Sequence, residues 1–378
     1  MLSNTDVMEL REIRHALHRA PEISGEERET ARAIVAYLTP FAPDKIVTDL
    51  GGHGVAAVYE GAQDGPTLLF RCELDALPIQ ETPRAHESQT PGKAHLCGHD
   101  GHMTIMLGLA RLLHRKAPAR GRVVLMFQPA EETGVGGPAV VADPRFAPLK
   151  PDLSFSLHNS PGMPLGQVGL TTGAVSAASR GMEIVLAGHS SHAAEPEEAL
   201  SPRLALAKLM QDLPSLAGPR ADDYAMVTIT HANMGAPTFG ITPGNGTLFA
   251  TLRTGRDETM AALVADAEQM AHAAATADGL TIEINYHDVF EHTENAPEAV
   301  DILRIAMDTL AIPHGEDGGV ITPSEDFSAF TKIAPGAMLF LGAGEDCTVV
   351  HHPDYDFPDD LIPIGAHLFE RVVRDQLG

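Results

Sequence analysis

Residues 123–132 read VVLMFQPAEE, an apolar run followed by Gln-Pro-Ala and then by the adjacent pair Glu131-Glu132. A short apolar run of this kind, bounded by a proline, is typical of a buried β-strand. Similar runs lie at residues 54–59, 68–74 and 153–157, and a helical pattern lies at 102–115. Strands separated by helices predict an α/β fold with a mainly parallel sheet that is covered on both faces.

The pattern outside this region predicts a second domain. Apolar residues recur at helical spacing from Met8 to Leu17, with Asn4-Thr5 as capping candidates. Short strands alternate with helical segments in residues 179–290, which we expect to form a smaller α+β domain. The α/β pattern resumes after it, so residues 1–178 and 291–378 are predicted to form one discontinuous domain that holds the insertion.

Composition limits the possible partners and location. The chain has 378 residues, and 51 acidic residues against 26 basic ones give a formal net charge of −25. Such a charge repels nucleic acid and anionic membrane surfaces, so neither is an expected partner. The three cysteines make no disulfide framework, which fits a reducing compartment. No basic leader or long apolar run is evident, and we expect a cytoplasmic protein.

Metal-capable side chains follow several predicted strands at the point where each strand ends. Asp75 follows residues 68–74, Glu131-Glu132 follow 123–127, and His158 follows 153–157. The late pair His351-His352 follows Thr348-Val349-Val350 and can return to the same edge. Ligands gather outside the carboxyl ends of the strands in open α/β sheets. The sequence therefore predicts a metal site at one edge of the sheet.

The loop HLCGHDGH at residues 95–102 supplies further candidates. Side chains alternate along an extended loop, so Cys97 and His99 can converge on one point while Gly98 lets the backbone turn. A thiolate with an imidazole suits zinc better than magnesium or calcium. Two ligands do not close a site, and the alternative is a polar loop whose histidines cap the following helix.

The adjacent glutamates suggest a division of labour. Neighbouring side chains point in different directions, so one carboxylate can bind metal while the other takes a proton from water. The alternative is a solvated acidic pair. An apolar strand and Pro129 before the pair, and glycines after it, favour the functional interpretation.

Several motifs, in order along almost the whole chain, resemble the metal-dependent aminoacylase and carboxypeptidase-type family. The branch they resemble contains hippurate hydrolase, bacterial N-acyl-amino-acid amidohydrolases and plant auxin-conjugate hydrolases. The motifs are Arg14-His15-Ala16-Leu17-His18, Pro21-Glu22-Ile23-Ser24, Asp75-Ala76-Leu77-Pro78-Ile79, Cys97-Gly98-His99-Asp100-Gly101-His102, Phe127-Gln128-Pro129-Ala130-Glu131-Glu132, Leu157-His158-Asn159, Ser191-His192-Ala193-Ala194, Ser324-Glu325-Asp326-Phe327, and His351 before Pro353.

The resemblance implies a centre with two divalent metal ions and assigns roles to residues. Zinc is the expected metal, and manganese, cobalt or nickel also suit such a mixed site. Glu131 is implied as the general base, His192 as the group that stabilises the oxyanion, Arg253 as the group that meets a substrate carboxylate, and Asp75 as the support of a ligand. The implied metal ligands are Cys97, His99, Glu132, His158 and His351.

Two positions depart from the family pattern. Glu73 stands where an aspartate is usual, and Gly240 stands where relatives often carry a substrate-binding asparagine. The first change leaves the metal assignment intact, whereas the second leaves the identity of the substrate open. Cys72 inside its apolar strand is interpreted as a core residue, and His102 as a capping, surface or supporting group.

The resemblance implies a metal-dependent amidohydrolase that cleaves an N-acyl amino acid into an amino acid and a carboxylic acid. The inserted domain would act as a lid and as the dimerisation surface of a homodimer. One alternative is a dipeptidase or metallocarboxypeptidase that acts on small peptides. A more remote alternative is a non-catalytic protein that binds metal or an amino acid.

Overall fold

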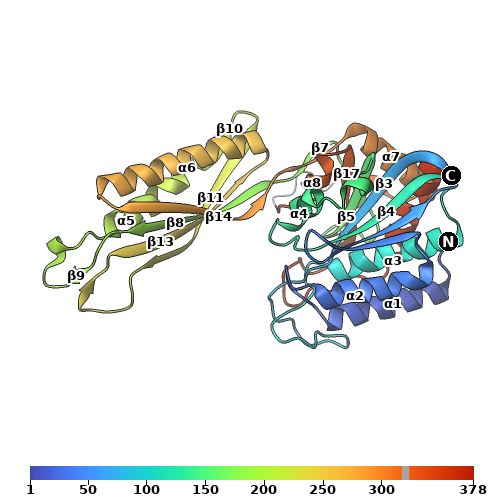
Figure 1. Cartoon of the computed structure of the whole chain (residues 1–378), viewed down its shortest axis with the longest axis horizontal. Helices are drawn as coiled ribbons and strands as arrows, with labels where there is room; N and C mark the ends of the chain where they lie inside the picture. The colour runs from blue at the N-terminus through green and yellow to red at the C-terminus, as the bar shows by residue number, and fades with distance from the viewer. Residues whose placement is uncertain (317–322) are drawn as a thin grey trace. The chain divides into compact units, whose positions relative to one another are not determined.

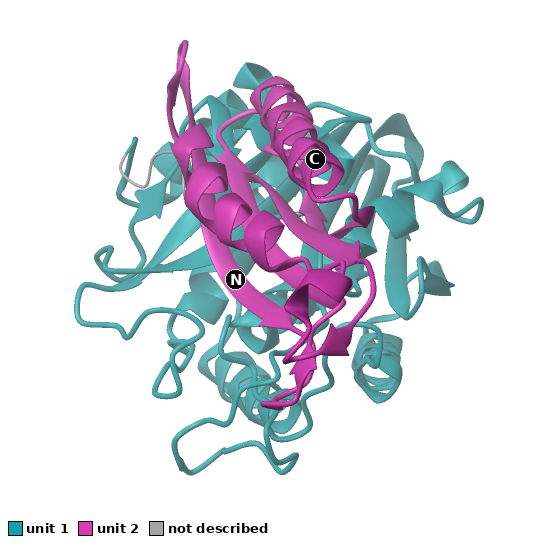
Figure 2. Cartoon of the chain, turned by 90° about the vertical axis from the view of Figure 1, so that its left-hand side faces the viewer, with its two compact units in different colours: residues 1–175, 293–321, 325–378 teal, residues 176–292, 322–324 magenta. Residues whose placement is uncertain are grey.

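The computed structural model describes residues 1–316 and 323–378. The chain divides into two compact units, coloured separately in Figure 2. Unit 1 holds residues 1–175 and nearly all of the chain after residue 292, and unit 2 holds residues 176–292 together with Pro323 and Ser324. Among the described residues, no helix is both long enough and apolar enough to cross a membrane.

Unit 1 is built on an eight-stranded sheet of order β1-β2-β4-β3-β5-β17-β6-β16 (Figure 1). The four neighbours β4, β3, β5 and β17 are parallel to one another, whereas β1 and β2 extend the sheet with antiparallel pairs. The predicted α/β class with a mainly parallel sheet is confirmed. The strands are β1 (Lys45–Leu50), β2 (Gly54–Glu60), β3 (Gln63–Glu73), β4 (Arg120–Gln128), β5 (Leu153–Pro161), β6 (Val168–Gly169), β16 (His314–Gly315) and β17 (Gly336–Gly344).

Alternate residues of the central strands enter two separate cores, one on each face of this sheet. In β4, Val123, Leu125 and Phe127 join one core, and Val124 and Met126 join the other. This two-residue period explains why a strand buried on both faces has a continuous apolar sequence. The first core includes residues of α1 (Asn4–Arg19), α2 (Arg28–Leu38), α3 (His99–Arg115), α7 (Pro297–Leu310) and α9 (Leu361–Leu377), and the second those of α4 (Gly136–Ala142) and α8 (Ser328–Thr331).

Helix α1 begins one residue earlier than the Asn4-Thr5 capping candidates suggested. Ser3 is the N-cap, and its hydroxyl accepts a hydrogen bond from the Asp6 amide at 3.2 Å. The Asp6 carboxylate in turn accepts one from the Ser3 amide at 2.6 Å. The prediction was wrong because this reciprocal capping box satisfies two amides, which a cap at Asn4 would not do.

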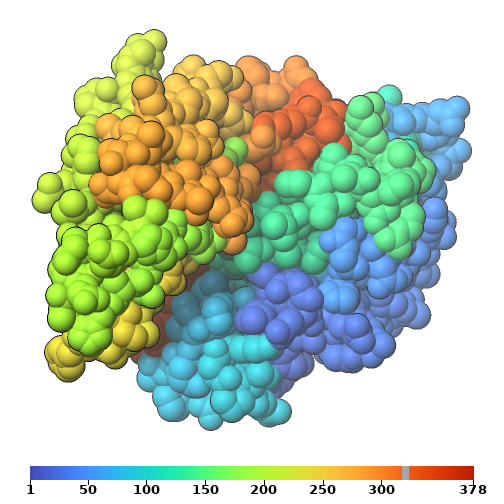
Figure 3. Space-filling model, turned by 60° about the vertical axis from the view of Figure 1, so that its left-hand side comes forward, coloured from blue at the N-terminus to red at the C-terminus, as the bar shows by residue number. Residues whose placement is uncertain are grey.

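The long connection between β3 and α3 delivers Cys97 to the sheet edge. It is fixed to the N-terminal helices, since the Gln89 amide donates a hydrogen bond to the Arg19 carbonyl at 2.8 Å. A side-chain ion pair joins Lys93 to Glu26. Figure 3 shows this cyan segment beside the blue N-terminal residues. The connection is therefore an ordered part of unit 1.

Unit 2 contains a five-stranded antiparallel sheet of order β10-β11-β13-β8-β14. Helices α5 (Arg203–Asp212) and α6 (Asp257–Ala277) share an apolar core with one face of this sheet. The side chains on its other face are largely polar or exposed. The strands of unit 2 are β8 (Ala178–Ala187), β10 (Gly218–Arg220), β11 (Asp223–Met234), β13 (Asn245–Thr254) and β14 (Thr281–Phe290), with the short pair β9 (Ser191–His192) and β12 (Ile241–Thr242). A second short pair, β7 (Gly173–Ser176) and β15 (Thr293–Asn295), lies almost wholly in unit 1.

Candidate metal centre

The carboxyl ends of β3, β4 and β5 bring most of the predicted site residues to one edge of unit 1. Asp75 follows β3, the two glutamates follow β4, and His158 lies near the end of β5. His99 is the first residue of α3. Three groups of residues there each have potential ligand atoms that all lie within 4.8 Å of one another. They are Cys97 with His99 and His158, Cys97 with Glu132 and His351, and His99 with Glu131 and Glu132.

The distances define a compact ring of donor atoms from Cys97, His99, Glu132, His158 and His351, which we call the donor ring. Cys97 Sγ lies 3.3 Å from His158 Nε2. His99 Nε2 lies 3.9 Å from Glu132 Oε1, and His351 Nε2 lies 3.6 Å from Glu132 Oε2. Glu132 therefore lies between two histidines, with one carboxylate oxygen toward each.

Two of the imidazoles are oriented by hydrogen bonds on the far side of the ring. His99 Nδ1 donates to the Asp75 carbonyl at 2.8 Å, and His158 Nδ1 donates to the Asn159 carbonyl at 2.8 Å. These bonds place the proton on Nδ1 and leave Nε2 as the lone-pair atom. Within the described parts of the chain, the buried atoms His99 Nε2 and Glu132 Oε1 have no hydrogen-bond partner.

This donor set fits a divalent transition-metal ion. Buried nitrogen and carboxylate atoms without partners are costly, and a cation between them would satisfy both. A thiol with imidazoles and a carboxylate suits zinc and its neighbours rather than a hard cation such as magnesium. Asp75 braces the arrangement, because its Oδ2 accepts hydrogen bonds from the Ser24 hydroxyl at 2.7 Å and the Glu132 amide at 2.9 Å.

Backbone conformation at this edge is strained. Ala130 and His351 have positive φ angles of 49° and 65°. Non-glycine residues rarely adopt this conformation, and it concentrates at functional sites. Gly98 has φ 97°, and a Cβ there would lie 2.2 Å from Asn159 Oδ1. Only glycine therefore fits between Cys97 and His99.

Burial and the crowding of negative groups shift the pKa values of the side chains in and beside the donor ring. Burial, together with the charges of Glu325 and Glu132, raises the pKa of Glu131 well above its usual range. Burial also raises the pKa of Glu132 to about 7 and that of the Cys97 thiol well above its usual range. Burial lowers the pKa of His158 to about 3. A cation would favour the deprotonated forms of the carboxyls and the thiol.

A buried cluster of charged side chains lies next to the donor ring. The arginine of this cluster was not identified from the sequence as a functional residue. Arg71 Nη2 lies 2.6 Å from Asp326 Oδ1 and 2.8 Å from Glu325 Oε1. Arg71 Nη1 also pairs with Glu73, and Arg71 Nε donates to Gln128 Oε1 at 2.8 Å. Two residues of opposite charge, Arg71 and Glu73, inside the otherwise apolar run 68–74 were the available signal. The cluster supports Glu73 beneath the metal-capable groups.

His102 is wholly buried in the first turn of α3 rather than at the surface. Its Nδ1 lies 2.7 Å from Glu73 Oε2, and its Nε2 lies 2.6 Å from Asn159 Oδ1. Asn159 also supplies the carbonyl that orients His158. Glu73 and His102 therefore support the end of β5. The sequence left three roles open for His102, as a capping, surface or supporting group, and the structure shows the supporting one.

His192 and Arg253 belong to unit 2, whereas the metal-capable ring belongs to unit 1. His192 is exposed at the end of β9, and its Nδ1 accepts a hydrogen bond from the Ala194 amide at 3.0 Å. The ring proton of neutral His192 is thus on Nε2. Arg253 lies on β13 and donates from Nη1 to the Ser324 hydroxyl at 3.0 Å. Burial lowers the pKa of Arg253.

Residues 69–375 match peptidase family M20/M25/M40. The chain belongs to this family. Its predicted relationship to the aminoacylase and carboxypeptidase-type enzymes and its predicted class, a metal-dependent hydrolase, are therefore confirmed. Most of the chain is covered by the match, which includes every predicted site residue.

Relatives of known name cover nearly the full length. The chain is 30% identical over 374 residues to hippurate hydrolase of Campylobacter jejuni, covering 98% of this chain and 97% of that protein. It is 28% identical over 373 residues to N-acetylcysteine deacetylase of Bacillus subtilis, covering 95% and 94%. The solved structure of a Bacillus subtilis protein described as a dinuclear metal binding peptidase of the M20 family aligns with a TM-score of 0.82, 26% identity and 99% coverage of both chains.

Proposed function

We propose that this M20-family hydrolase is an amidohydrolase that cleaves the amide bond of N-acyl amino acids. The observation that carries the proposal is the ring of donor atoms around His99 Nε2 and Glu132 Oε1, which have no hydrogen-bond partner among the described residues, with the additional carboxylate of Glu131 beside it. Names of relatives support the substrate class, since hippurate hydrolase and N-acetylcysteine deacetylase both act on N-acylated amino acids.

The proposed centre holds two divalent cations, as in the similar dinuclear protein. Zinc is favoured by the Cys97 sulfur, and manganese, cobalt or nickel also suit the mixed donor set. When bound, the cations act as Lewis acids that polarise the amide carbonyl and make a water molecule acidic. The proposed ligands are Cys97, His99, Glu132, His158 and His351.

Glu131 is the proposed general base. Its carboxylate lies 3.8 Å from His99 Nε2, at the edge of the ring. It would take a proton from the attacking water and return that proton to the leaving amine. Burial raises the pKa of Glu131 in the metal-free chain, and the bound cations would lower it again, so that the carboxylate could accept the proton.

We propose that side chains of unit 2 bind the substrate. The Nε2–H of His192 is suited to donate a hydrogen bond to the oxyanion that forms during attack. Arg253 is suited to pair with the carboxylate of the substrate. We infer that residues 179–290 act as a lid and dimerisation domain of a cytoplasmic homodimer, and that the substrate is a small molecule.

A substrate panel tests the proposed reaction. Purified protein loaded with zinc or manganese would be offered N-acetyl-, N-benzoyl- and indole-3-acetyl-amino acids and a matched set of dipeptides, with release of free amino acid as the readout. We expect turnover of at least one N-acyl class to exceed that of every dipeptide. Faster hydrolysis of dipeptides would replace the proposal by a dipeptidase, and no turnover of either set would contradict it.

The role of Glu131 is tested by Glu131→Gln, with the exposed Glu12→Gln as the matched control. We expect the first variant to lose a factor of about 10³ in kcat, since general acid–base catalysis contributes about 10²–10⁴. Its metal content, measured by mass spectrometry, should equal that of the wild type. Intact turnover, or loss of metal together with turnover, would disprove the assignment as base.

A further inference from the structure

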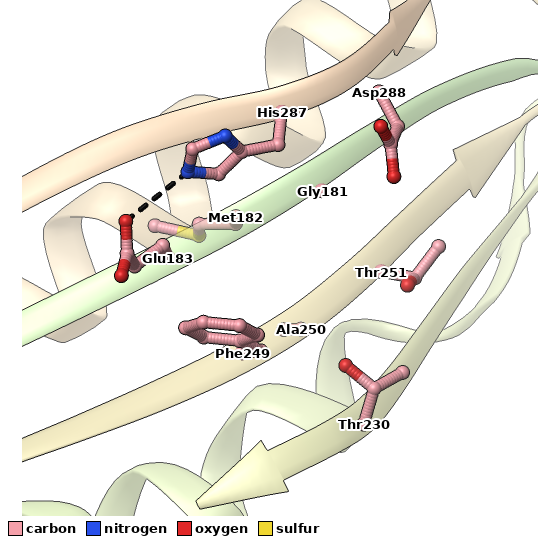
Figure 4. Close-up of a pocket in the computed structure, with 9 residues that line it drawn as sticks. All are labelled: Gly181, Met182, Glu183, Thr230, Phe249, Ala250, Thr251, His287 and Asp288. Atoms are coloured by element: carbon pink, nitrogen blue, oxygen red, sulfur yellow. Dashed lines mark hydrogen bonds and ion pairs between the residues drawn. The ribbon is translucent and has the colours of Figure 1, made fainter. Parts of the chain in front are cut away.

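The open face of the unit 2 sheet carries a hollow of about 330 Å³. Strands β8, β11, β13 and β14 all contribute to its wall, and every residue that lines it belongs to unit 2 (Figure 4). A hollow of this volume is at the lower end of the range for small-molecule sites. It is separate from the residues of the proposed metal centre, all of which lie in unit 1.

Gly181 creates the hollow. It lies on β8 opposite Thr251 of β13 and His287 of β14, so it is the one position in this row of three without a side chain. A Cβ at Gly181 would lie only 2.9 Å from the His287 carbonyl oxygen. The floor of the hollow is therefore bare backbone between two side chains.

A β-bulge in β14 directs the carboxylate of Asp288 toward the hollow. The pairing of β14 with β8 shifts between His287 and Phe290, and Asp288 inside this irregularity has φ 47°. Bulges re-aim side chains, and Asp tolerates this backbone conformation better than most residues. Figure 4 shows the Asp288 carboxylate directed toward the hollow. Among the described residues, the side chain of Asp288 has no hydrogen-bond or ion-pair partner.

Glu183 and Phe249 form the other side of the wall. Glu183 Oε2 is held by His287 Nε2 at 3.1 Å and by Asn285 Nδ2 at 3.3 Å. Phe249 is 38% exposed and presents its ring to the hollow (Figure 4). None of the described residues that line the hollow is a lysine or an arginine. Its chemistry is thus two carboxylates, one of them paired with the His287 imidazole, together with an aromatic ring, a methionine and threonine hydroxyls.

We propose that this hollow binds a small organic cation, an alkylammonium or alkylguanidinium group. Its charge would face Asp288 and Glu183, and its alkyl part would lie on the Phe249 ring. An N-acyl amino acid is an anion and would be repelled by the same carboxylates. The ligand is therefore a different molecule from the proposed substrate.

Titration calorimetry at physiological ionic strength tests this site, with agmatine as the probe and 4-guanidinobutyrate, a zwitterion in which a carboxylate replaces the ammonium group, as the comparison. We expect saturable binding of one agmatine per chain and much weaker binding of 4-guanidinobutyrate. Asp288→Asn should weaken agmatine about tenfold or more, the loss expected when one charged contact is removed. Asparagine also tolerates the positive φ, so this variant keeps the bulge.

Two further variants separate a built site from general attraction to an acidic protein. Phe249→Leu should weaken agmatine several-fold, whereas Asp222→Asn, an exposed aspartate outside the hollow, should leave its affinity unchanged. Absence of saturable binding would overturn the proposal. Equal weakening by Asp288→Asn and Asp222→Asn, or no weakening by Asp288→Asn, would overturn it as well.

Discussion

The edge of the unit 1 sheet and the open face of the unit 2 sheet both carry polar side chains. The charged side chains are buried at the first and exposed to solvent at the second. At the unit 1 edge, Asp75 and His99 are fully buried, and each is held by partners from other elements. On the unit 2 face, Glu183 and Asp288 remain in contact with solvent. Buried charges have shifted pKa values and demand compensation, whereas exposed ones are free to meet a ligand.

The difference suggests that the two units have separate tasks. A parallel sheet covered on both faces sends its strand ends to one rigid edge, which suits chemistry that needs fixed geometry. An antiparallel sheet with one open face presents alternate side chains to solvent, which suits recognition. Variants in the two units should therefore fail in different ways.

The largest expected effect separates His99 in unit 1 from His192 in unit 2. His99→Ala should lose metal and turnover together, because it removes a proposed ligand. His192→Ala should lower kcat by about 10²–10³, the range for an oxyanion donor, while its metal content stays at the wild-type value. Metal analysis and kinetics on both variants check this prediction. Equal loss of metal in both variants would contradict the proposal that only His99 of these two histidines binds metal.

The next effect concerns the buried cation Arg71. Arg71→Met leaves Glu73, Glu325 and Asp326 buried without the arginine that neutralises them, so the free energy of unfolding should fall by about 3–5 kcal/mol. The exposed pair of Arg32 and Glu29 offers a control, and Arg32→Met should cost no more than about 1 kcal/mol. Urea unfolding of both variants gives these values. Similar losses would show that burial does not set the cost.

A smaller effect is a pH dependence that comes from His18. Its ring lies 2.9 Å from Asp100 Oδ2 and 3.0 Å from Glu81 Oε2. Burial alone would lower the pKa of His18, but these two carboxylates raise it to about 9 from an ordinary value of 6.5. A raised pKa stabilises the fold below about pH 6.5, and this contribution is lost as the pH rises through about 9.

We therefore expect the wild type to exceed His18→Gln in unfolding free energy by about 3 kcal/mol more at pH 6 than at pH 10, since one pKa unit corresponds to about 1.4 kcal/mol. Urea unfolding across this range measures the difference. The exposed His114→Gln provides the control and should show no such trend. A constant difference between wild type and His18→Gln would contradict the charged network.

Much of unit 1 was predictable because its strands are short and apolar. VVLMF at residues 123–127 predicted β4, and the strand ends predicted that Asp75, Glu131-Glu132 and His158 share an edge. Local periodicity was sufficient there, since burial on both faces leaves a continuous apolar run. The assignment of individual ligands rested on the family resemblance and stays a prediction.

The supporting residues behind the ring were not predictable from local pattern. Arg71 meets Asp326, which is 255 residues away in the chain, and no periodicity connects the two. His102 at the start of a helix is compatible with a capping group until Glu73 and Asn159 are seen against it. Partners of buried charges depend on tertiary packing, so they appear only in the folded structure.

The most direct test of the metal centre is a crystal structure of the zinc-loaded protein with anomalous scattering measured at the zinc absorption edge. We predict two peaks about 3.5–4 Å apart. They should be bounded by Cys97, His99, Glu132, His158 and His351. The Glu131 carboxylate should coordinate neither ion. A single peak, or an ion held by Glu73, His99 and His102 or by Glu131, Glu325 and Asp326, would contradict this assignment.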